Sequence, residues 1–224
     1  MIRLKFDIGG NVFEMSKIRM DMNAGRQPVL GLYPTIVIGT MVDGKPDFTT
    51  VAWTGVAASV PPTLTISLQH HRHSLKGVRG NMAFSVNIPS VDLVKETDYC
   101  GLASGARIDK AADCRFTVFY GALENAPFIE EFPVNHACEV TQILNLGSHE
   151  LIVGKIVETY ISQGCLTDGR PDPEKIRPIA YLGGSYNAVG AHIGEAFKCG
   201  IDINPKARLD TLEEIRRAQE KTKS

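Results

Sequence analysis

The sequence predicts a mainly β protein built on an antiparallel β-barrel and flanked by short helices. Runs rich in β-branched and aromatic residues recur along the chain, and turn-forming residues join several of these runs into hairpins. Long helical patterns do not alternate with the strands, as a doubly wound α/β sheet would require. The antiparallel architecture is therefore favoured.

Three β-rich runs in the first half of the chain are expected to form strands. TIVIGTMV (residues 35–42) precedes DGKPD, whose Asp-Gly pair and proline favour a turn, and a second β-prone run begins at Phe48, which predicts a hairpin. TLTISL (63–68) alternates apolar and hydroxyl residues, which indicates one buried face. MAFSVNI (82–88) resumes the strand pattern.

Short helices are expected between the strands. Ser74 is a candidate N-cap for one helical turn, and Ser90 is a candidate N-cap for a helix over residues 91–101. A later turn begins with Pro173 at its first position and is stopped by Pro178.

The second half continues the β character. RFTVFYG (115–121), HACEVTQILNL (136–146) and HELIVGKIVETYI (149–161) are strand-like, and a Gly-Ser turn between the last two predicts a long antiparallel pair. Residues 205–224 carry a narrow apolar stripe at helical spacing, which predicts a C-terminal helical tail packed on the body or on a partner subunit. One domain over residues 1–224 is expected from the length.

Composition narrows the classes of function. The formal net charge of -1 provides no global basic field and argues against non-specific binding to nucleic acid. The N-terminus lacks the pattern of a secretory signal, and no stretch approaches the roughly 18 apolar residues of a membrane span. A cytoplasmic protein without a membrane segment is expected.

The five cysteines are widely spaced and never form a CxxC pair, which predicts reduced thiols rather than a disulfide framework or a zinc site. Cys100 is near a predicted helix end and has two interpretations, a redox role or a buried structural thiol. A helix C-terminus does not lower the pKa of a thiol, so the buried, inert interpretation is favoured.

The common nucleotide motifs fail. GSHELIVGK places Gly147 seven positions before Gly154, where a phosphate loop needs five, and Ile156 replaces the hydroxyl that would bind magnesium. GGSYNAVG (183–190) lacks the three-glycine spacing of a dinucleotide fingerprint.

Three histidines, His70, His71 and His73, do not predict a metal site. Neighbours in an extended strand point to opposite faces, and no second cluster of metal-ligating residues accompanies them. The serines and histidines lack a GxSxG elbow, so no nucleophile is assigned.

The stretch TTVAWTGVAASVPPTLTISLQHHRHS (49–74) contains the donors that a phosphate dianion needs. The hydroxyls of Thr49, Thr50 and Ser74 can donate, as can the guanidinium of Arg72 and the N–H groups of turns. Ser74 can also begin a helix whose positive end favours an anion. The alternative is a solvated strand end with ordinary caps.

The same stretch, followed by MAFSVNIPS, resembles the flavin reductase-like, FMN-binding split-barrel family. ETDYCGLASG (96–105), FIEEFPV (128–134), VGKIVE (153–158) and DGRPDPEKIRPIAYLGGSY (168–186) are similar to its flavoredoxin-like members in particular. The resemblance covers about residues 32–200, and its specificity comes from several motifs in one order.

The resemblance implies a split β-barrel of six antiparallel strands in Greek-key order, with short flanking helices and a C-terminal helix. It also implies a homodimer with FMN near the subunit interface. Trp53 and Ala52 would lie near the flavin ring system, and Arg72 and Ser74 would be the leading phosphate donors. The implied cofactor-binding residues are Thr49, Thr50, Val51, Ala52, Trp53, Thr54, Gln69, His71, Arg72, His73, Ser74 and Asn87.

The histidines at 70, 71 and 73 depart from the Lys, Arg or other residues common there in the family, so the phosphate charge depends partly on imidazole protonation. Other residues keep two interpretations. Asn87 either faces the flavin edge or forms a turn before Ile-Pro. Trp53 lies at the flavin or in the core. Tyr181 and Tyr186 either close over the flavin or fill the barrel mouth, and His149 either meets substrate or lies exposed in a turn.

The expected function is that of an FMN-dependent oxidoreductase of the flavin reductase or flavoredoxin type. It would pass electrons from NAD(P)H or a redox-protein partner through FMN to an acceptor. The isoalloxazine supplies the redox chemistry, so no catalytic residue is assigned. Two alternatives are a non-enzymatic FMN-binding electron-transfer protein and a structural barrel that has lost FMN.

Overall fold

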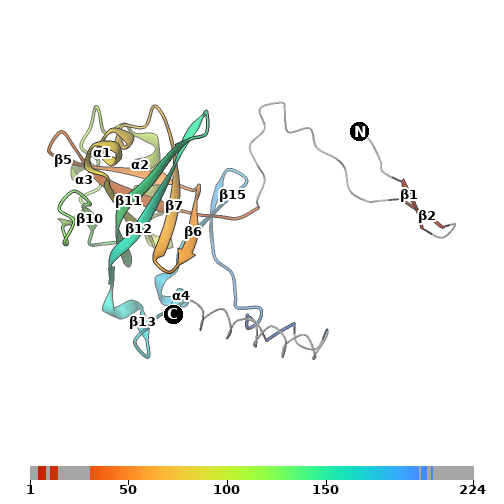
Figure 1. The fold of residues 1–224 in the computed structure, drawn as a ribbon. Helices are drawn as coiled ribbons and strands as arrows, with labels where there is room; N and C mark the ends of the chain where they lie inside the picture. Colours follow the sequence, from red (N-terminus) through yellow and green to blue (C-terminus); the bar gives the residue numbers. More distant parts are fainter. Residues whose placement is uncertain (1–4, 9–10, 15–30, 197, 201–202, 204–224) are drawn as a thin grey trace, which may run out of the picture. The chain divides into compact units, whose positions relative to one another are not determined.

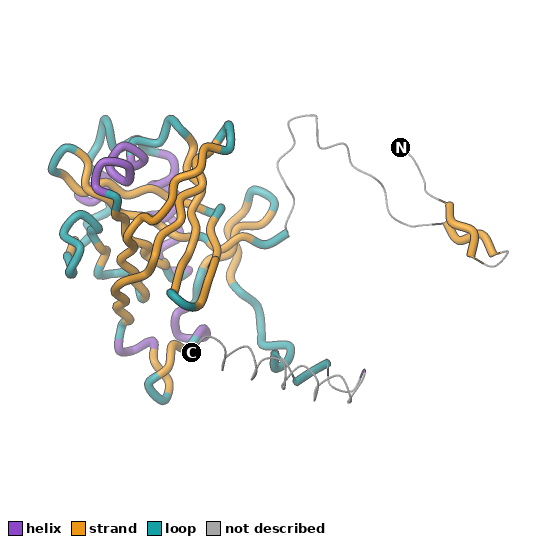
Figure 2. Tube along the Cα trace, viewed as in Figure 1, coloured by secondary structure: helices purple, strands orange, loops and turns teal. Residues whose placement is uncertain are grey.

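Figures 1 and 2 show the computed structural model, which describes residues 5–8, 11–14, 31–196, 198–200 and 203. The chain divides into two compact units, Met1–Ala188 and Val189–Ser224. Strands β1–β16 and helices α1–α4 all belong to the first unit. The predicted helical tail over residues 205–224 lies outside the described residues, and the expectation of one domain over the whole chain stays a prediction.

An antiparallel sheet of seven strands forms the centre of the first unit (Figure 2). Its strands are Ile36–Val42 (β4), Lys45–Val51 (β5), Thr54–Ser59 (β6), Pro62–Gln69 (β7), Ala83–Ile88 (β8), Val134–Asn145 (β11) and His149–Ile161 (β12). Their order is β5-β4-β8-β11-β12-β7-β6. Because β5 and β6 are consecutive in the chain but lie at opposite ends of this order, the sheet must curl until its ends meet at Ala52 and Trp53. The expected split barrel is therefore confirmed.

The sheet has seven strands rather than the implied six, because the segment before the double proline pairs with β7. The β6–β7 register runs from Thr54 opposite Ile66 to Ser59 opposite Pro62, with a bulge between Val56 and Ala58.

Smaller strands and short helices surround this sheet (Figure 1). The additional strands are Lys5–Ile8 (β1), Asn11–Glu14 (β2), Tyr33–Pro34 (β3), Val118–Phe119 (β9), Phe128–Ile129 (β10), Leu166–Thr167 (β13), Arg170–Pro171 (β14), Ile179–Leu182 (β15) and Ser185–Ala188 (β16). The helices are Ser74–Asn81 (α1), Val94–Leu102 (α2), Lys110–Asp113 (α3) and Pro173–Ile176 (α4), and 3₁₀ turns span Val91–Leu93 and Gln163–Cys165. Within the described part of the chain, no helix combines the length and apolar character needed to span a bilayer.

Both expected hairpins form, with one change of boundary. β5 begins at Lys45 rather than at Phe48, because Asp43 and Gly44 make the turn alone with positive φ angles of 50° and 79°. The β11–β12 hairpin turns at Gly147, whose φ is 84°. Of the predicted strand over residues 115–121, only β9 is regular.

The predicted helix caps are less accurate. Ser74 is the first residue of α1 rather than its N-cap, and its hydroxyl donates to Asp47 instead. Ser90 makes no side-chain cap hydrogen bond, and the expected helix is divided into a 3₁₀ turn and α2. The predicted turn at Pro173 is confirmed, with the carboxylate of Asp172 accepting from the N–H of Glu174.

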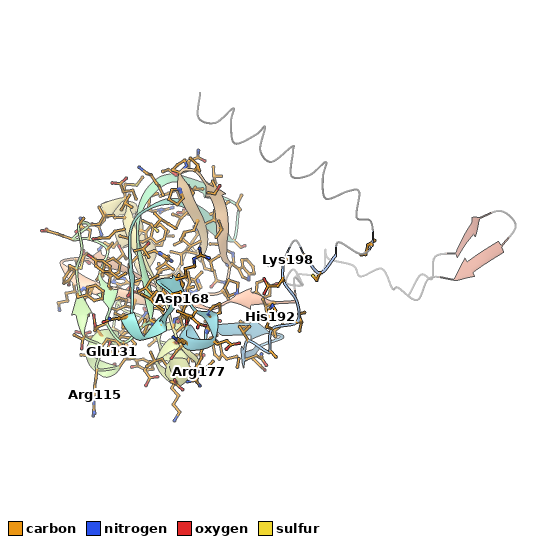
Figure 3. All side chains as sticks on the ribbon, turned by 90° about the horizontal axis from the view of Figure 1, so that it is seen from below. Arg115, Glu131, Asp168, Arg177, His192 and Lys198 are labelled. Carbon is orange, nitrogen blue, oxygen red and sulfur yellow. The ribbon has the colours of Figure 1, made fainter. Side chains whose placement is uncertain are left out.

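Apolar side chains fill the interior of the curled sheet. The charged side chains of Arg115 and Arg177 project away from the body, as Figure 3 shows. The main buried cluster includes Ile38, Ile66 and Phe84, each with no exposed surface. A second cluster lies under α2 and α3 and includes Phe48, Cys100 and Phe132. This packing fixes the elements whose ends form the site.

Candidate functional site

A cavity of about 310 Å³ opens where the two ends of the curled sheet meet, and we call it the barrel-end pocket. Its walls come from the end of β5, the Ala52–Trp53 link, β7, the start of β12, α2 and the β15–β16 hairpin. The structure brings six of the predicted cofactor-binding residues to this pocket: Thr50, Val51, Ala52, Trp53, Gln69 and Arg72.

Two aromatic rings from distant parts of the chain stack at one wall. The centroids of the Trp53 indole and the His149 imidazole are 4.4 Å apart and their planes are inclined by 27°. Burial lowers the pKa of His149, and the neighbouring His70, His71 and Arg72 lower it further. Both rings line the pocket, which favours the ligand-facing interpretations of these two residues.

A tyrosine from the β15–β16 hairpin forms another wall. The hydroxyl of Tyr186 donates to Asp98 of α2 over 2.9 Å, and burial, followed by this hydrogen bond, raises the pKa of Tyr186. The ring of Tyr181 packs edge-on against it, with centroids 5.7 Å apart. The hairpin is thus tied to α2 beside the pocket, which favours the interpretation in which these tyrosines cover a ligand.

The pocket also contains a buried hydroxyl that lacks a partner. Thr35 is 2% exposed and lines the pocket. Among the described residues, its Oγ1 is the buried side-chain polar atom without a hydrogen bond. Such a group costs about 1–3 kcal/mol when it is unpaired, and this oxygen is covered by protein rather than exposed to the pocket.

A second recess of about 180 Å³, here the basic recess, shares Arg72 and Leu102 with the barrel-end pocket. The predicted residues Thr49, His71 and His73 line it. Its other polar side chains come from the segment after α2 and from α3, namely Ser104, Arg107 and Lys110. None of the described residues that line this recess is acidic, so the recess suits an anion.

Arg72 lies at the junction of these two cavities. One guanidinium nitrogen, Nη1, donates to the backbone carbonyl of Gly101 over 2.6 Å, which fixes the side chain against the end of α2. Its remaining N–H groups are available to a ligand because the guanidinium carries five donors.

Lys110 lies beneath the recess in a buried network. It is 4% exposed, and its ammonium donates to the carbonyls of Phe48 and Cys100 and lies 3.6 Å from a carboxylate oxygen of Asp47. Burial lowers the pKa of Lys110, and the charge of Asp47 opposes that effect. The hydroxyl of Ser74 donates to the same carboxylate over 2.6 Å.

Three predicted cofactor-binding residues are not brought to either cavity. Ser74 is 1% exposed and its hydroxyl is used by Asp47, so its side chain is not placed to donate to a phosphate. The hydroxyl of Thr54 donates to the carbonyl of Thr65 over 2.8 Å. Asn87 is fully buried, and its amide side chain exchanges hydrogen bonds with four protein groups. Its role in the structure is to hold β8 against β4, β10 and β11.

His70 and Cys100 line neither of these two cavities. His70 contacts Glu150 and the carbonyl of Gly147, and no group of three or more metal-ligating side chains gathers within the described residues. Cys100 has no exposed surface and burial raises its pKa, as its buried interpretation requires.

Sequence reasoning missed several lining residues, notably Thr35, Asp98, Ser104, Arg107 and Lys110. Their types are common and they come from segments separated by tens of residues, so local spacing carries no signal for their convergence. One local indication of an anion site was available. The segment SGARIDK (104–110) follows a predicted helix and contains a Ser-Gly pair, an arginine and a lysine.

Comparisons with known proteins agree with this architecture. Residues 32–190 match the family described as flavin reductase like domain. Flavoredoxin from Methanosarcina acetivorans superposes with a TM-score of 0.78 and 33% identity, covering 84% of this chain and 100% of that one. Flavoredoxin of Desulfovibrio vulgaris (Miyazaki F) gives a TM-score of 0.74 and 29% identity over 81% of this chain and 100% of that one. An uncharacterized protein of Archaeoglobus fulgidus is 29% identical over 144 residues, which are 63% of this chain and 80% of its relative.

Proposed function

Because the chain belongs to the flavin reductase-like domain family, as a flavoredoxin-like member, we propose that it is an FMN-dependent oxidoreductase whose cofactor binds in the barrel-end pocket. The single observation that carries the proposal is the adjacency of this pocket, with its aromatic walls, to a basic recess through Arg72. A flat ring system and a phosphate dianion joined by a chain match these two cavities.

The residues present fit both ends of such a ligand. Val51, Ala52 and Trp53 offer backbone groups and apolar surface to the ring system. Arg72 and Arg107 supply positive charge at the phosphate end, whereas the charge of Lys110 is compensated by Asp47.

Thr49 and Ser104 add hydroxyls at the same end, and Ser104 there replaces the predicted Ser74. The proposed phosphate donors therefore lie closer to the segment between α2 and α3, and farther from the start of α1, than the sequence predicts.

FMN, when bound, supplies the capacity to accept a hydride and to release electrons singly or in pairs. The side chains orient it and limit the access of water. Tyr186 and Asp98 tie the β15–β16 hairpin beside the pocket, and the lowered pKa of His149 keeps that imidazole neutral near pH 7. None of these groups is required as an acid or a base.

We also propose that the protein acts as a cytoplasmic homodimer, with NAD(P)H or a redox protein as its electron donor. Strand β6 supports the dimer because it is an edge of the sheet and exposes Val56, while Val60 follows it. These side chains are 86% and 78% exposed. An exposed edge strand with apolar side chains is a surface on which another chain can pair or pack.

The test is an absorption spectrum of the purified protein after incubation with FMN and desalting, repeated anaerobically with NADH and then NADPH. A retained flavin band that bleaches with either nucleotide is expected. A retained band that bleaches only with a reduced redox protein supports the alternative, a non-enzymatic electron-transfer protein. Absence of a band at saturating FMN contradicts the proposed cofactor and supports a barrel that has lost it.

A further inference from the structure

A third depression, of about 460 Å³, lies along α1 and the loop that precedes it, and we call it the α1 groove. Five of the side chains that line it are cationic or become so on protonation: His70, Arg72, His73, Lys76 and Arg79. None of the described residues that line it is acidic. The lining of the groove therefore suits an anion.

A buried carboxylate holds two of these side chains in place. Glu150 is 1% exposed, and its carboxylate accepts from both Nε and Nη2 of Arg79, with the Nε bond at 3.0 Å. Its Oε1 lies 3.5 Å from Nδ1 of His70, whose Nε2 lies 2.7 Å from the carbonyl oxygen of Gly147. Both imidazole nitrogens thus face acceptors. The negative charge of Glu150 is compensated by Arg79 beneath the groove. The contacts with Glu150 also hold the side chains of Arg79 and His70 in place before a ligand binds.

Lys76 is more loosely held. Its ammonium pairs with Asp43 at 2.7 Å, and the two side chains are 63% and 68% exposed. An exposed pair of this kind contributes little free energy, so Lys76 can exchange Asp43 for a ligand with more charge.

The groove is connected to the proposed flavin site. Arg72 lines the barrel-end pocket, the basic recess and the α1 groove. FMN carries one phosphate, and the basic recess accounts for it. The α1 groove therefore remains for an anionic group of a second ligand that also reaches the flavin.

We propose that the α1 groove binds the phosphate monoester of the electron donor, the 2′-phosphate that distinguishes NADPH from NADH. This inference rests on the proposed function, because the nicotinamide must reach FMN in the barrel-end pocket. A phosphate dianion matches Lys76 and the imidazole of His73 as charge-assisted hydrogen-bond donors, whereas His70 is already used by Glu150 and Gly147. The phosphate of FMN has the same chemistry as the 2′-phosphate of NADPH and could occupy the same groove. The experiment distinguishes these two phosphates.

The probes are adenosine 2′,5′-bisphosphate and AMP, titrated calorimetrically into the FMN-loaded protein at low ionic strength. The bisphosphate is expected to bind at least tenfold more tightly than AMP, and Lys76→Ala is expected to remove most of that difference. Lys95→Ala is the matched control, because Lys95 is an exposed lysine on α2 that does not line the groove. It is expected to behave as the unchanged protein does.

FMN affinity is measured for the same variants. Equal binding of the two probes, or an effect of Lys95→Ala as large as that of Lys76→Ala, overturns the proposal. A loss of FMN affinity in Lys76→Ala, with the probe difference unchanged, assigns the groove to the flavin phosphate and also overturns it. Because the probes carry no nicotinamide, a protein that binds FMN but is reduced by neither a nicotinamide nucleotide nor a redox protein fails the proposed function without affecting this result.

Discussion

The imidazole of His149 and the indole of Trp53 stack across the opening of the barrel, with ring centroids 4.4 Å apart. Trp53 lies in the two-residue link between β5 and β6, and His149 is the first residue of β12. The stack therefore connects the split in the curled sheet, between β5 and β6, with the interior strand β12. Both rings line the barrel-end pocket and are therefore placed where a ligand could contact them.

Trp53 is the single tryptophan of the chain, so its fluorescence reports on this stack alone. Protonated imidazole quenches a stacked indole, and we expect the emission of the FMN-free protein to fall as the pH decreases through the pKa of His149. Burial lowers that pKa, and the neighbouring His70, His71 and Arg72 lower it further, so the midpoint should lie below 6.5. His149→Gln should abolish the transition. A midpoint at or above 6.5 contradicts the inferred environment of His149.

His136 makes the free energy of unfolding depend on pH. Burial lowers the pKa of His136 in the folded protein, and its Nδ1 lies 2.9 Å from the hydroxyl of Thr159. Below the unfolded pKa of about 6.5, the unfolded chain binds a proton that the folded chain resists, so stability must decrease as the pH falls. We expect urea denaturation of the FMN-free protein to show a lower free energy of unfolding at pH 5.5 than at pH 7.5. His136→Gln should reduce this difference, and an unchanged difference would assign it to other groups.

The Tyr186–Asp98 hydrogen bond makes the β15–β16 hairpin part of the site. Tyr186→Phe removes the donor to Asp98 and keeps the ring. One hydrogen bond contributes about 1 kcal/mol, so we expect the dissociation constant of FMN to rise roughly fivefold in a fluorescence titration. Tyr120→Phe is the control, because Tyr120 is 46% exposed and lines none of the three cavities. Equal effects of the two variants would show that Asp98 does not hold the hairpin over FMN.

The sequence predicted the barrel well because strand periodicity and turn chemistry are local. The alternation in TLTISL and the Asp-Gly turn each act within a few residues, and β7 and the β4–β5 hairpin follow from them. The register that closes the barrel is not local, since it depends on which strand each hairpin meets. β6 was missed because its small residues, GVAAS, leave an edge strand that is mostly exposed.

The site residues likewise separate into those with a local sequence signal and those that depend on long-range contacts. Thr50 to Trp53 and Arg72 are close in sequence to the strand ends that position them, and they were predicted. Ser74 lines neither cavity, because a hydroxyl at a helix start suits either a cap or an anion, and its pairing with Asp47 depends on a strand 27 residues away. Asn87 likewise meets partners from three other strands. Such long-range partners leave no local pattern.

Two glycines offer a matched test of the segment that forms the basic recess. A Cβ at Gly105 would clash with a carboxylate oxygen of Asp47, so Gly105→Ala must displace the buried Asp47–Lys110 pair. Overpacking of this kind costs about 1–3 kcal/mol, and we expect a loss of that size in the free energy of unfolding. Gly80→Ala in α1 meets nothing within 4 Å and should instead add about 0.5–1 kcal/mol. Equal effects would mean that the segment after α2 adjusts freely.

Arg72 and Ser74 were predicted together as phosphate donors, and the structure separates them. Arg72 lines the basic recess, whereas the hydroxyl of Ser74 is buried against Asp47. Arg72→Ala should weaken FMN binding at least tenfold and leave riboflavin binding nearly unchanged, because a charge-assisted hydrogen bond to phosphate contributes about 1.5–3 kcal/mol and riboflavin has no phosphate.

Ser74→Ala should do the reverse. It removes a donor to a buried carboxylate, so we expect a loss of about 1–3 kcal/mol in the free energy of unfolding, with the preference for FMN over riboflavin retained. Dissociation constants for both flavins and urea midpoints for both variants check the pair of outcomes. If Ser74→Ala removed the preference for FMN while Arg72→Ala kept it, the phosphate would lie at the start of α1 and not in the basic recess.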